Sequence, residues 1–231
     1  MMDDMIDRKA IGKAVMEGVQ AANRRYEAWS RGGWLTDTGA EAPVVSAVGE
    51  KLHQAIAGEG SIEMQMPFRA ILDWSAARRR NGRSRFIENP HDRVDIVILD
   101  RNWHPVCAVE VNRFWRDEEC LADLESVRDL IVESGDRNGS LAAGFLAFLL
   151  DGWEEEDCTA GECLEFRRNW IEEKLRERFD ADGLNMEFCL GPGRQYPKKY
   201  RALRQERDWV HAAFCIALRR GVPHTDARSA P

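Results

Sequence analysis

The spacing of apolar positions predicts helices at the start of the chain. In residues 6–29 and 44–57, apolar side chains recur at steps of three and four, the period of an amphipathic helix. Gly58 and Gly60 end the second of these segments. The expected buried stripes consist of Ile11, Val15, Val19, Ala22, Tyr26 and Trp29 in the first helix and of Val44, Val48, Leu52 and Ile56 in the second.

Farther along, the pattern changes to the period of two that is typical of strands. Residues 61–72 alternate apolar with polar positions, and 94–99 and 106–112 form two apolar runs around a polar turn at 100–104. Residues 141–150 are almost wholly apolar, as expected for a strand that is buried on both faces. We therefore expect a hairpin in the middle of the chain and a central strand after it.

The remaining segments complete a mixed pattern. Helices are predicted over 117–133 and 163–179, and a short strand over 184–190. Periodicity does not decide whether 209–219 is a strand or a helix, and the glycines and prolines of 191–200 predict a loop. Strands that alternate with helices indicate an α/β fold.

The chain has 231 residues, a length that suits one substantial domain with small additions. We expect an N-terminal helix and linker at 1–40, an α/β domain at 41–220 and a tail at 221–231. The apolar fraction of 44% supports a packed core. Because no apolar run approaches the ~20 residues of a membrane span and no signal peptide is evident, we expect a soluble cytoplasmic protein without a membrane partner.

The six cysteines are interpreted as small buried hydrophobic residues rather than as a metal site, because no histidine lies near the closest pair, Cys158 and Cys163. Their even number is no evidence for disulfides in a chain without a secretion signal.

The net charge of −7 argues against a protein that coats nucleic acid without specificity, but it does not exclude a nuclease. A local basic strip can still meet phosphate groups, and residues 78–85 hold five arginines: Arg78, Arg79, Arg80, Arg83 and Arg85. A second basic group spans 198–207. The alternative interpretation of both segments is a solvated loop or helix face.

The predicted hairpin carries acidic residues where buried strands rarely do. Asp95 opens the first strand, and Glu110 lies between valines in the second. Residues two apart in a strand share a face, so Glu110 and Asn112 point the same way. An antiparallel hairpin would bring the carboxyl groups of Asp95 and Glu110 together. With the backbone carbonyl of Val111 they would form an oxygen-rich site suited to Mg²⁺ or Mn²⁺.

At these residues the chain resembles the restriction-endonuclease-like PD-(D/E)XK nuclease superfamily. The likeness covers residues 44–150 and matches Asp95 and the strand motif Glu110-Val111-Asn112, with Glu50 as the helix glutamate. It implies a mixed central sheet flanked by helices, here with an extra N-terminal helix and a C-terminal α/β extension. It also implies that Asp95 and Glu110 bind the metal and that Glu50 supports a second metal or a water molecule.

One departure from the family pattern concerns the motif lysine, which is Asn112 in this chain. A neutral amide can orient a water molecule but supplies no charge. Arg113 points to the opposite face of the strand, whereas Lys51 or Arg128 on the flanking helices could reach inward. Structural alternatives remain for single residues: Asp95 could pair with Arg93, and Asp123 and Arg128 would lie on the exposed side of their helix. His91 could lie at the rim of the site, although a solvated loop position is the simpler interpretation.

The expected function is metal-dependent hydrolysis of phosphodiester bonds in nucleic acid, with DNA favoured over RNA. Asp95, Glu110, Glu50 and Asn112 would carry the chemistry with Mg²⁺ or Mn²⁺, and the arginine strip would contact the phosphate backbone without reading sequence. The alternative is an inactive relative that binds nucleic acid or a protein, for example in a bacterial defence or mobile-element system. A third option is a structural subunit that docks on a partner, and a homodimer remains open.

Overall fold

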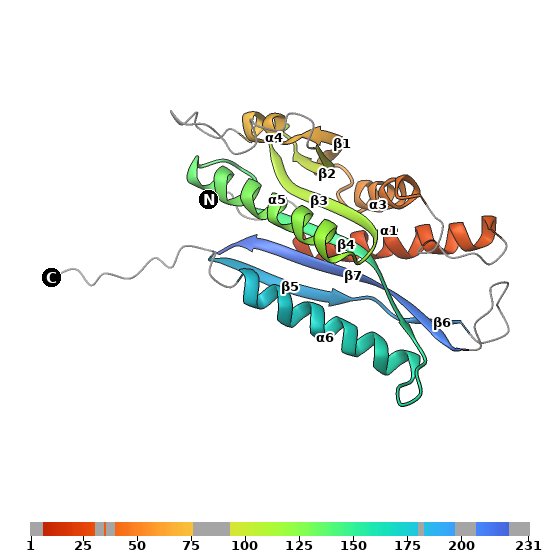
Figure 1. Cartoon of the computed structure of the whole chain (residues 1–231). Helices are drawn as coiled ribbons and strands as arrows, with labels where there is room; N and C mark the ends of the chain where they lie inside the picture. Colours follow the sequence, from red (N-terminus) through yellow and green to blue (C-terminus); the bar gives the residue numbers. More distant parts are fainter. Residues whose placement is uncertain are drawn as a thin grey trace.

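A mixed sheet forms the centre of the protein in a computed structural model, which describes residues 7–30, 35, 40–75, 93–179, 183–196 and 207–221. The seven strands follow the order β1-β2-β3-β4-β7-β5, and β6 also pairs with β7 (Figure 1). Their bounds are β1 (Gly60–Pro67), β2 (Arg93–Asp100), β3 (Pro105–Phe114), β4 (Ala143–Trp153), β5 (Leu184–Leu190), β6 (Arg194–Tyr196) and β7 (Trp209–Arg220).

The described sheet is antiparallel except for one neighbouring pair of strands. β1, β2 and β3 form an antiparallel meander, whereas β3 and β4 run parallel. A parallel pair needs a crossover connection, and the helix α5 (Asp117–Asp136) provides it. β7 returns antiparallel to β4 along its whole length, and β5 pairs with the other edge of β7.

Helices cover both faces of the sheet (Figure 1). On one face α1 (Arg8–Trp29) and α3 (Ala42–Ala55) pack on side chains of β2, β3, β4 and β7. On the other face α4 (Phe68–Trp74), α5 and α6 (Ala160–Phe179) enclose a second apolar core. The central strand β4 contributes to both cores, with Phe145 on the first face and Phe148 on the second. This explains why its sequence is almost continuously apolar.

The two helices of the first face approach each other closely at Gly18. A Cβ atom on Gly18 would overlap the backbone of Val48 in α3. Glycine is therefore required at this position of α1 because any side chain would separate the helices.

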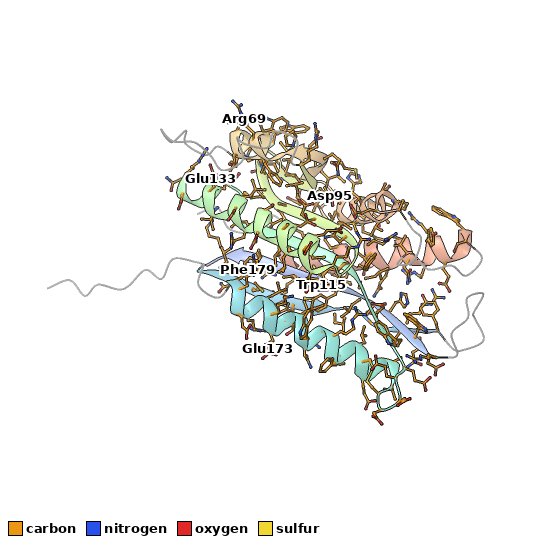
Figure 2. The ribbon with its side chains drawn as sticks, viewed as in Figure 1. Arg69, Asp95, Trp115, Glu133, Glu173 and Phe179 are labelled. Atoms are coloured by element: carbon orange, nitrogen blue, oxygen red, sulfur yellow. A yellow bond between two sulfur atoms is a disulfide. The ribbon has the colours of Figure 1, made fainter. Side chains whose placement is uncertain are left out.

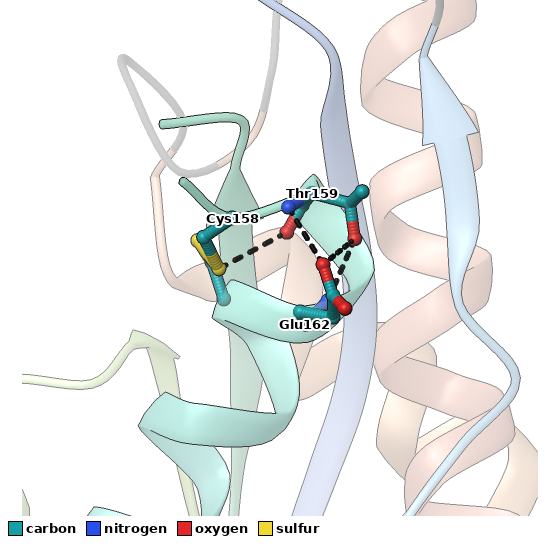
Figure 3. The surroundings of a disulfide bond; sticks show 4 residues. Cys158, Thr159 and Glu162 are labelled. Carbon is teal, nitrogen blue, oxygen red and sulfur yellow. Dashed lines mark hydrogen bonds between the residues drawn. A yellow bond between two sulfur atoms is a disulfide. The ribbon is translucent and has the colours of Figure 1, made fainter. Parts of the chain in front are cut away.

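The start of α6 is fixed by a capping box, shown in Figure 3. The Glu162 carboxylate accepts hydrogen bonds from the backbone N–H and the hydroxyl of Thr159, at 2.9 and 2.7 Å, and the Glu162 N–H donates to Thr159 Oγ1 at 3.3 Å. In the same turn Cys158 and Cys163 form a disulfide, which the sequence had given no reason to expect.

The sequence-based expectation of an α/β fold, with a mixed sheet flanked by helices, is confirmed. Three details differ. Residues 61–72 are not one strand, because Pro67 ends β1 in an extended conformation and α4 follows. Residues 194–196 of the expected loop form β6, and Trp29 is 70% exposed rather than part of the buried stripe.

The undecided segment at 209–219 is a strand, β7. Its side chains enter both apolar cores, so both of its faces are buried and periodicity could not identify it. Among the helices that the structure describes, none combines the length and the apolar character needed to cross a bilayer.

Candidate functional site

Asp95 and Glu110 lie opposite each other where β2 and β3 stop pairing through their backbones. The last regular pair near this end is Ile96 with Val109. Beyond it, side chains replace backbone partners: the Asp95 N–H donates to Glu110 Oε2 at 3.3 Å, and the Val111 N–H donates to Asp95 Oδ2 at 2.9 Å. The hairpin therefore brings the two carboxyl groups together, as the sequence predicts.

The environment of this pair disfavours two negative charges. Glu110 is only 6% exposed, and its pKa is raised well above the ordinary value by burial and then by the charges of Asp95 and Asp123. The pKa of Asp95 is raised by burial, although hydrogen bonds from the Val111 N–H, Glu110 and Gln65 oppose this effect. The interaction between the two carboxyl groups adds to the rise of the pKa of Glu110 and opposes the rise of the pKa of Asp95.

Asn112 extends the site toward α5. Its side chain is 9% exposed, and its amide donates to Asp123 Oδ2 at 2.7 Å and to Cys120 Sγ at 3.5 Å. The pKa of Asp123 is raised by burial and then by the charges of Asp95 and Glu119. Asn112, at the position where the resemblance implies a lysine, is thus held by a third acidic residue.

The expectation that Asp123 lies on the exposed side of its helix is wrong. Asp123 follows the buried Cys120 by three positions and precedes the buried Val127 by four, so it shares their face of α5. That spacing is a signal in the sequence that could have identified Asp123 as part of the site.

Glu50 does not lie with the carboxyl pair. It is exposed on α3 and forms an ion pair with Arg25 of α1 at 2.8 Å. The hydrogen bond from Arg25 lowers the pKa of Glu50. This placement corrects the role that the resemblance implied for Glu50.

A different glutamate faces the site from the start of the same helix. Glu41 precedes α3, and its pKa is raised by partial burial and then by the charges of Asp95 and Asp123. Sequence reasoning missed Glu41 because nothing in its local pattern shows that the N-terminus of α3 approaches the ends of β2 and β3. Figure 2 shows Asp95 between α3 and α5, the helices at which Glu41 and Asp123 lie.

The other basic candidates have partners elsewhere. Lys51 Nζ donates to Gln54 on α3 at 3.2 Å. Arg128 pairs with Asp129 and lies over the ring of Phe179 at 5.4 Å, so it does not replace the motif lysine. The arginine strip (Arg78, Arg79, Arg80, Arg83 and Arg85) and His91 lie outside the described residues.

A pocket of about 170 Å³ opens beside Asn112. Two guanidinium groups flank the ring of Phe114 in its wall, that of Arg113 at 4.8 Å and that of Arg116 at 4.6 Å. Arg116 also pairs with Glu119 at 2.7 Å. The lining residues are Glu41, Asn112, Arg113, Phe114, Arg116 and Glu119.

The donor chemistry fits a hard divalent cation. Asp95 and Glu110 present carboxylate oxygens, and Val111 adds a backbone carbonyl to the same stretch of β3. The charges that act on Glu110, those of Asp95 and Asp123, are both negative, so a cation would relieve their repulsion. Within the described ranges no three side chains of His, Cys, Asp or Glu gather as a metal-binding group.

Comparisons with family models, curated proteins and solved structures find no match to this chain. The function is therefore argued from the site.

Proposed function

We propose that this protein is a nuclease that hydrolyses phosphodiester bonds with Mg²⁺ or Mn²⁺ as cofactor. The observation that carries the proposal is the coupled pair of Asp95 and Glu110 at the point where β2 and β3 separate. Burying two carboxyl groups together destabilises a fold unless they are paired, hydrogen-bonded or bound to a metal, and such groups are concentrated at functional sites. A divalent cation is the partner that matches its oxygen donors and its charge.

The arrangement of elements supports a restriction-endonuclease-like fold. The elements follow the order α3, β1, α4, β2, β3, α5, β4, with β3 and β4 parallel across α5. Apart from the short helix α4, this is the order that the resemblance to the PD-(D/E)XK superfamily implies. The acidic pair occupies the two middle strands of this unit, where the superfamily carries its motif.

In the proposed reaction Asp95 and Glu110 hold the cation, with the carbonyl of Val111 beside them. The cation would polarise the phosphate and lower the pKa of a bound water molecule. Asp123 acts as the general base in place of a lysine, because burial raises its pKa toward the working pH. Asn112 holds the carboxylate of Asp123 in place through its amide.

The proposed substrate is nucleic acid, with DNA favoured over RNA, and the proposed location is the cytoplasm. Arg113 and Arg116 lie against the ring of Phe114 in the lining of the pocket, where they would meet a phosphate backbone bound beside Asn112. The arginine strip at 78–85 would add contacts that give affinity without sequence choice.

A second candidate function is an inactive relative that binds nucleic acid or a protein partner. The position of Asn112 favours it, because the amide is held by Asp123 and Cys120 and brings no positive charge to the site. Such a protein would keep the fold and a binding surface but would not cleave.

A cleavage assay distinguishes the two candidates. Single- and double-stranded DNA and RNA are incubated with Mn²⁺ or Mg²⁺ and one of three proteins: the wild type, Asp95→Asn or Glu50→Gln. Glu50→Gln is the matched control, because Glu50 lies on the protein surface. We expect cleavage by the wild type and by Glu50→Gln and none by Asp95→Asn. Absence of cleavage of every substrate by a folded wild type would favour the binding role, and equal cleavage by Asp95→Asn would contradict the site.

A further inference from the structure

The backbone of β1 is distorted at one residue, Gln65. Its φ of 56° lies in the left-handed region, which is strained for a residue with a Cβ atom. The pairing with β2 is nevertheless in the same register on both sides, since Met64 pairs with Ile96 and Met66 with Val94. The distortion therefore leaves the register between β1 and β2 unchanged, and it affects only Gln65 and its immediate surroundings.

The distorted residue is the one whose side chain reaches the candidate site. Gln65 Nε2 donates to Asp95 Oδ1 at 2.7 Å, while the Val111 N–H holds Asp95 Oδ2. The carbonyl of Gln65 accepts a hydrogen bond from the Arg93 guanidinium at 2.8 Å, which secures the unusual backbone conformation. Both oxygens of Asp95 are thus oriented, one from β3 and the other from β1.

We propose that Gln65 is a positioning residue that orients the carboxylate of Asp95 toward a divalent cation. The metal in this inference rests on the proposed function. The hydrogen bond from Gln65 to Asp95 does not depend on that proposal. Strained backbone is concentrated at functional sites, where the surrounding structure maintains it. Partners that orient a metal ligand typically contribute about 10- to 100-fold to metal affinity or activity.

The first test is Mn²⁺ affinity, measured from the electron paramagnetic resonance signal of free Mn²⁺. We expect the dissociation constant to rise about 10-fold in Gln65→Ala and in Gln65→Gly, and to stay unchanged in the control Gln54→Ala, which alters an exposed amide on α3. Gln65→Gly should have the higher melting temperature of the two, because glycine adopts a positive φ without strain. Wild-type affinity in both Gln65 variants would overturn the proposal.

The second test needs neither metal nor activity. In nuclear magnetic resonance spectra of the metal-free protein, one side-chain amide proton of Gln65 should be shifted downfield and protected from exchange, relative to the amide of Gln54. Asp95→Ala should remove that difference. If the wild type binds no Mn²⁺ but the Gln65 amide is protected, Gln65 still positions Asp95 and the proposed cofactor is rejected. An unprotected Gln65 amide would overturn the positioning role itself.

Discussion

At the scale of single residues, the unusual feature is the group of acidic side chains with raised pKa values around Glu110. Asp95, Glu110 and Asp123 all have raised pKa values, mainly because burial disfavours their charged forms. The chain places Asn112 among them, so no charge on that residue offsets theirs. The chemistry of the site therefore depends on what supplies positive charge.

A lysine at position 112 should supply part of that charge. In Asn112→Lys the ammonium group would lie between Asp123 and the carboxyl pair, and we expect cleavage to accelerate about 10-fold or more. The measurement is the single-turnover rate of cleavage with Mn²⁺, compared among the wild type, Asn112→Lys and Asn112→Ala. Asn112→Ala lacks both the amide and the charge. A folded Asn112→Lys that cleaves no faster than wild type would show that the missing lysine does not limit the reaction.

His211 gives a pH dependence that is independent of the site. His211 is 2% exposed on β7, where it pairs with Asp151 of β4 and contacts the ring of Tyr196. Burial lowers the pKa of His211 to about 4, although the charge of Asp151 opposes this shift. Because the unfolded chain binds a proton near pH 6.5 and the folded chain does not, the stabilising contribution is complete above that pH and is lost as pH falls toward 4.

Urea unfolding at pH 7 and pH 4.5 measures this effect. We expect the wild type to lose about 2 kcal/mol more than His211→Gln between the two values. His53→Gln, which changes an exposed histidine on α3, should behave as the wild type does. An equal acid loss in wild type and His211→Gln would mean that His211 is protonated within the fold.

At the scale of elements, the contact between α1 and α3 depends on a missing side chain. Gly18→Ala would place a methyl group on the backbone of Val48, so we expect a loss of about 1–3 kcal/mol in the free energy of unfolding. Gly161 in the first turn of α6 has open space around it, and Gly161→Ala should stabilise by up to about 1 kcal/mol. Chemical denaturation measures the free energy of unfolding of both variants. An unchanged free energy of unfolding in Gly18→Ala would contradict the close packing of α1 and α3.

The elements also show where sequence patterns are informative. The predictions for β2, β3, α5 and β4 agree with the structure within a few residues, because α5 has a clear helical period and the three strands are apolar runs with defined ends. The boundary between β1 and α4 was missed because Met64 and Met66 continue an alternation up to Pro67, and Phe68, Ile71 and Leu72 then change to helical spacing. A change of period over so few residues gives little signal.

At the scale of the whole molecule, the fold brings together side chains from five separate segments. Asp95 and Glu110 could be identified from the sequence because hairpin spacing and strand alternation determine their meeting. Asp123 has a weaker signal in the sequence, its spacing from Cys120 and Val127 on α5. Glu41 and Gln65 could not be placed with them, since their positions depend on helix packing and on one distorted backbone angle. These contributions arise only from the tertiary structure.

The central claim is that the Asp95–Glu110 pair binds a divalent cation, and calorimetric titration with Mn²⁺ tests it most directly. The account predicts saturable binding to the wild type and to Glu50→Gln, and no binding to a folded Glu110→Gln, which preserves the shape of the side chain but cannot ionise. Wild-type binding by Glu110→Gln, or no binding by the wild type itself, would contradict the claim.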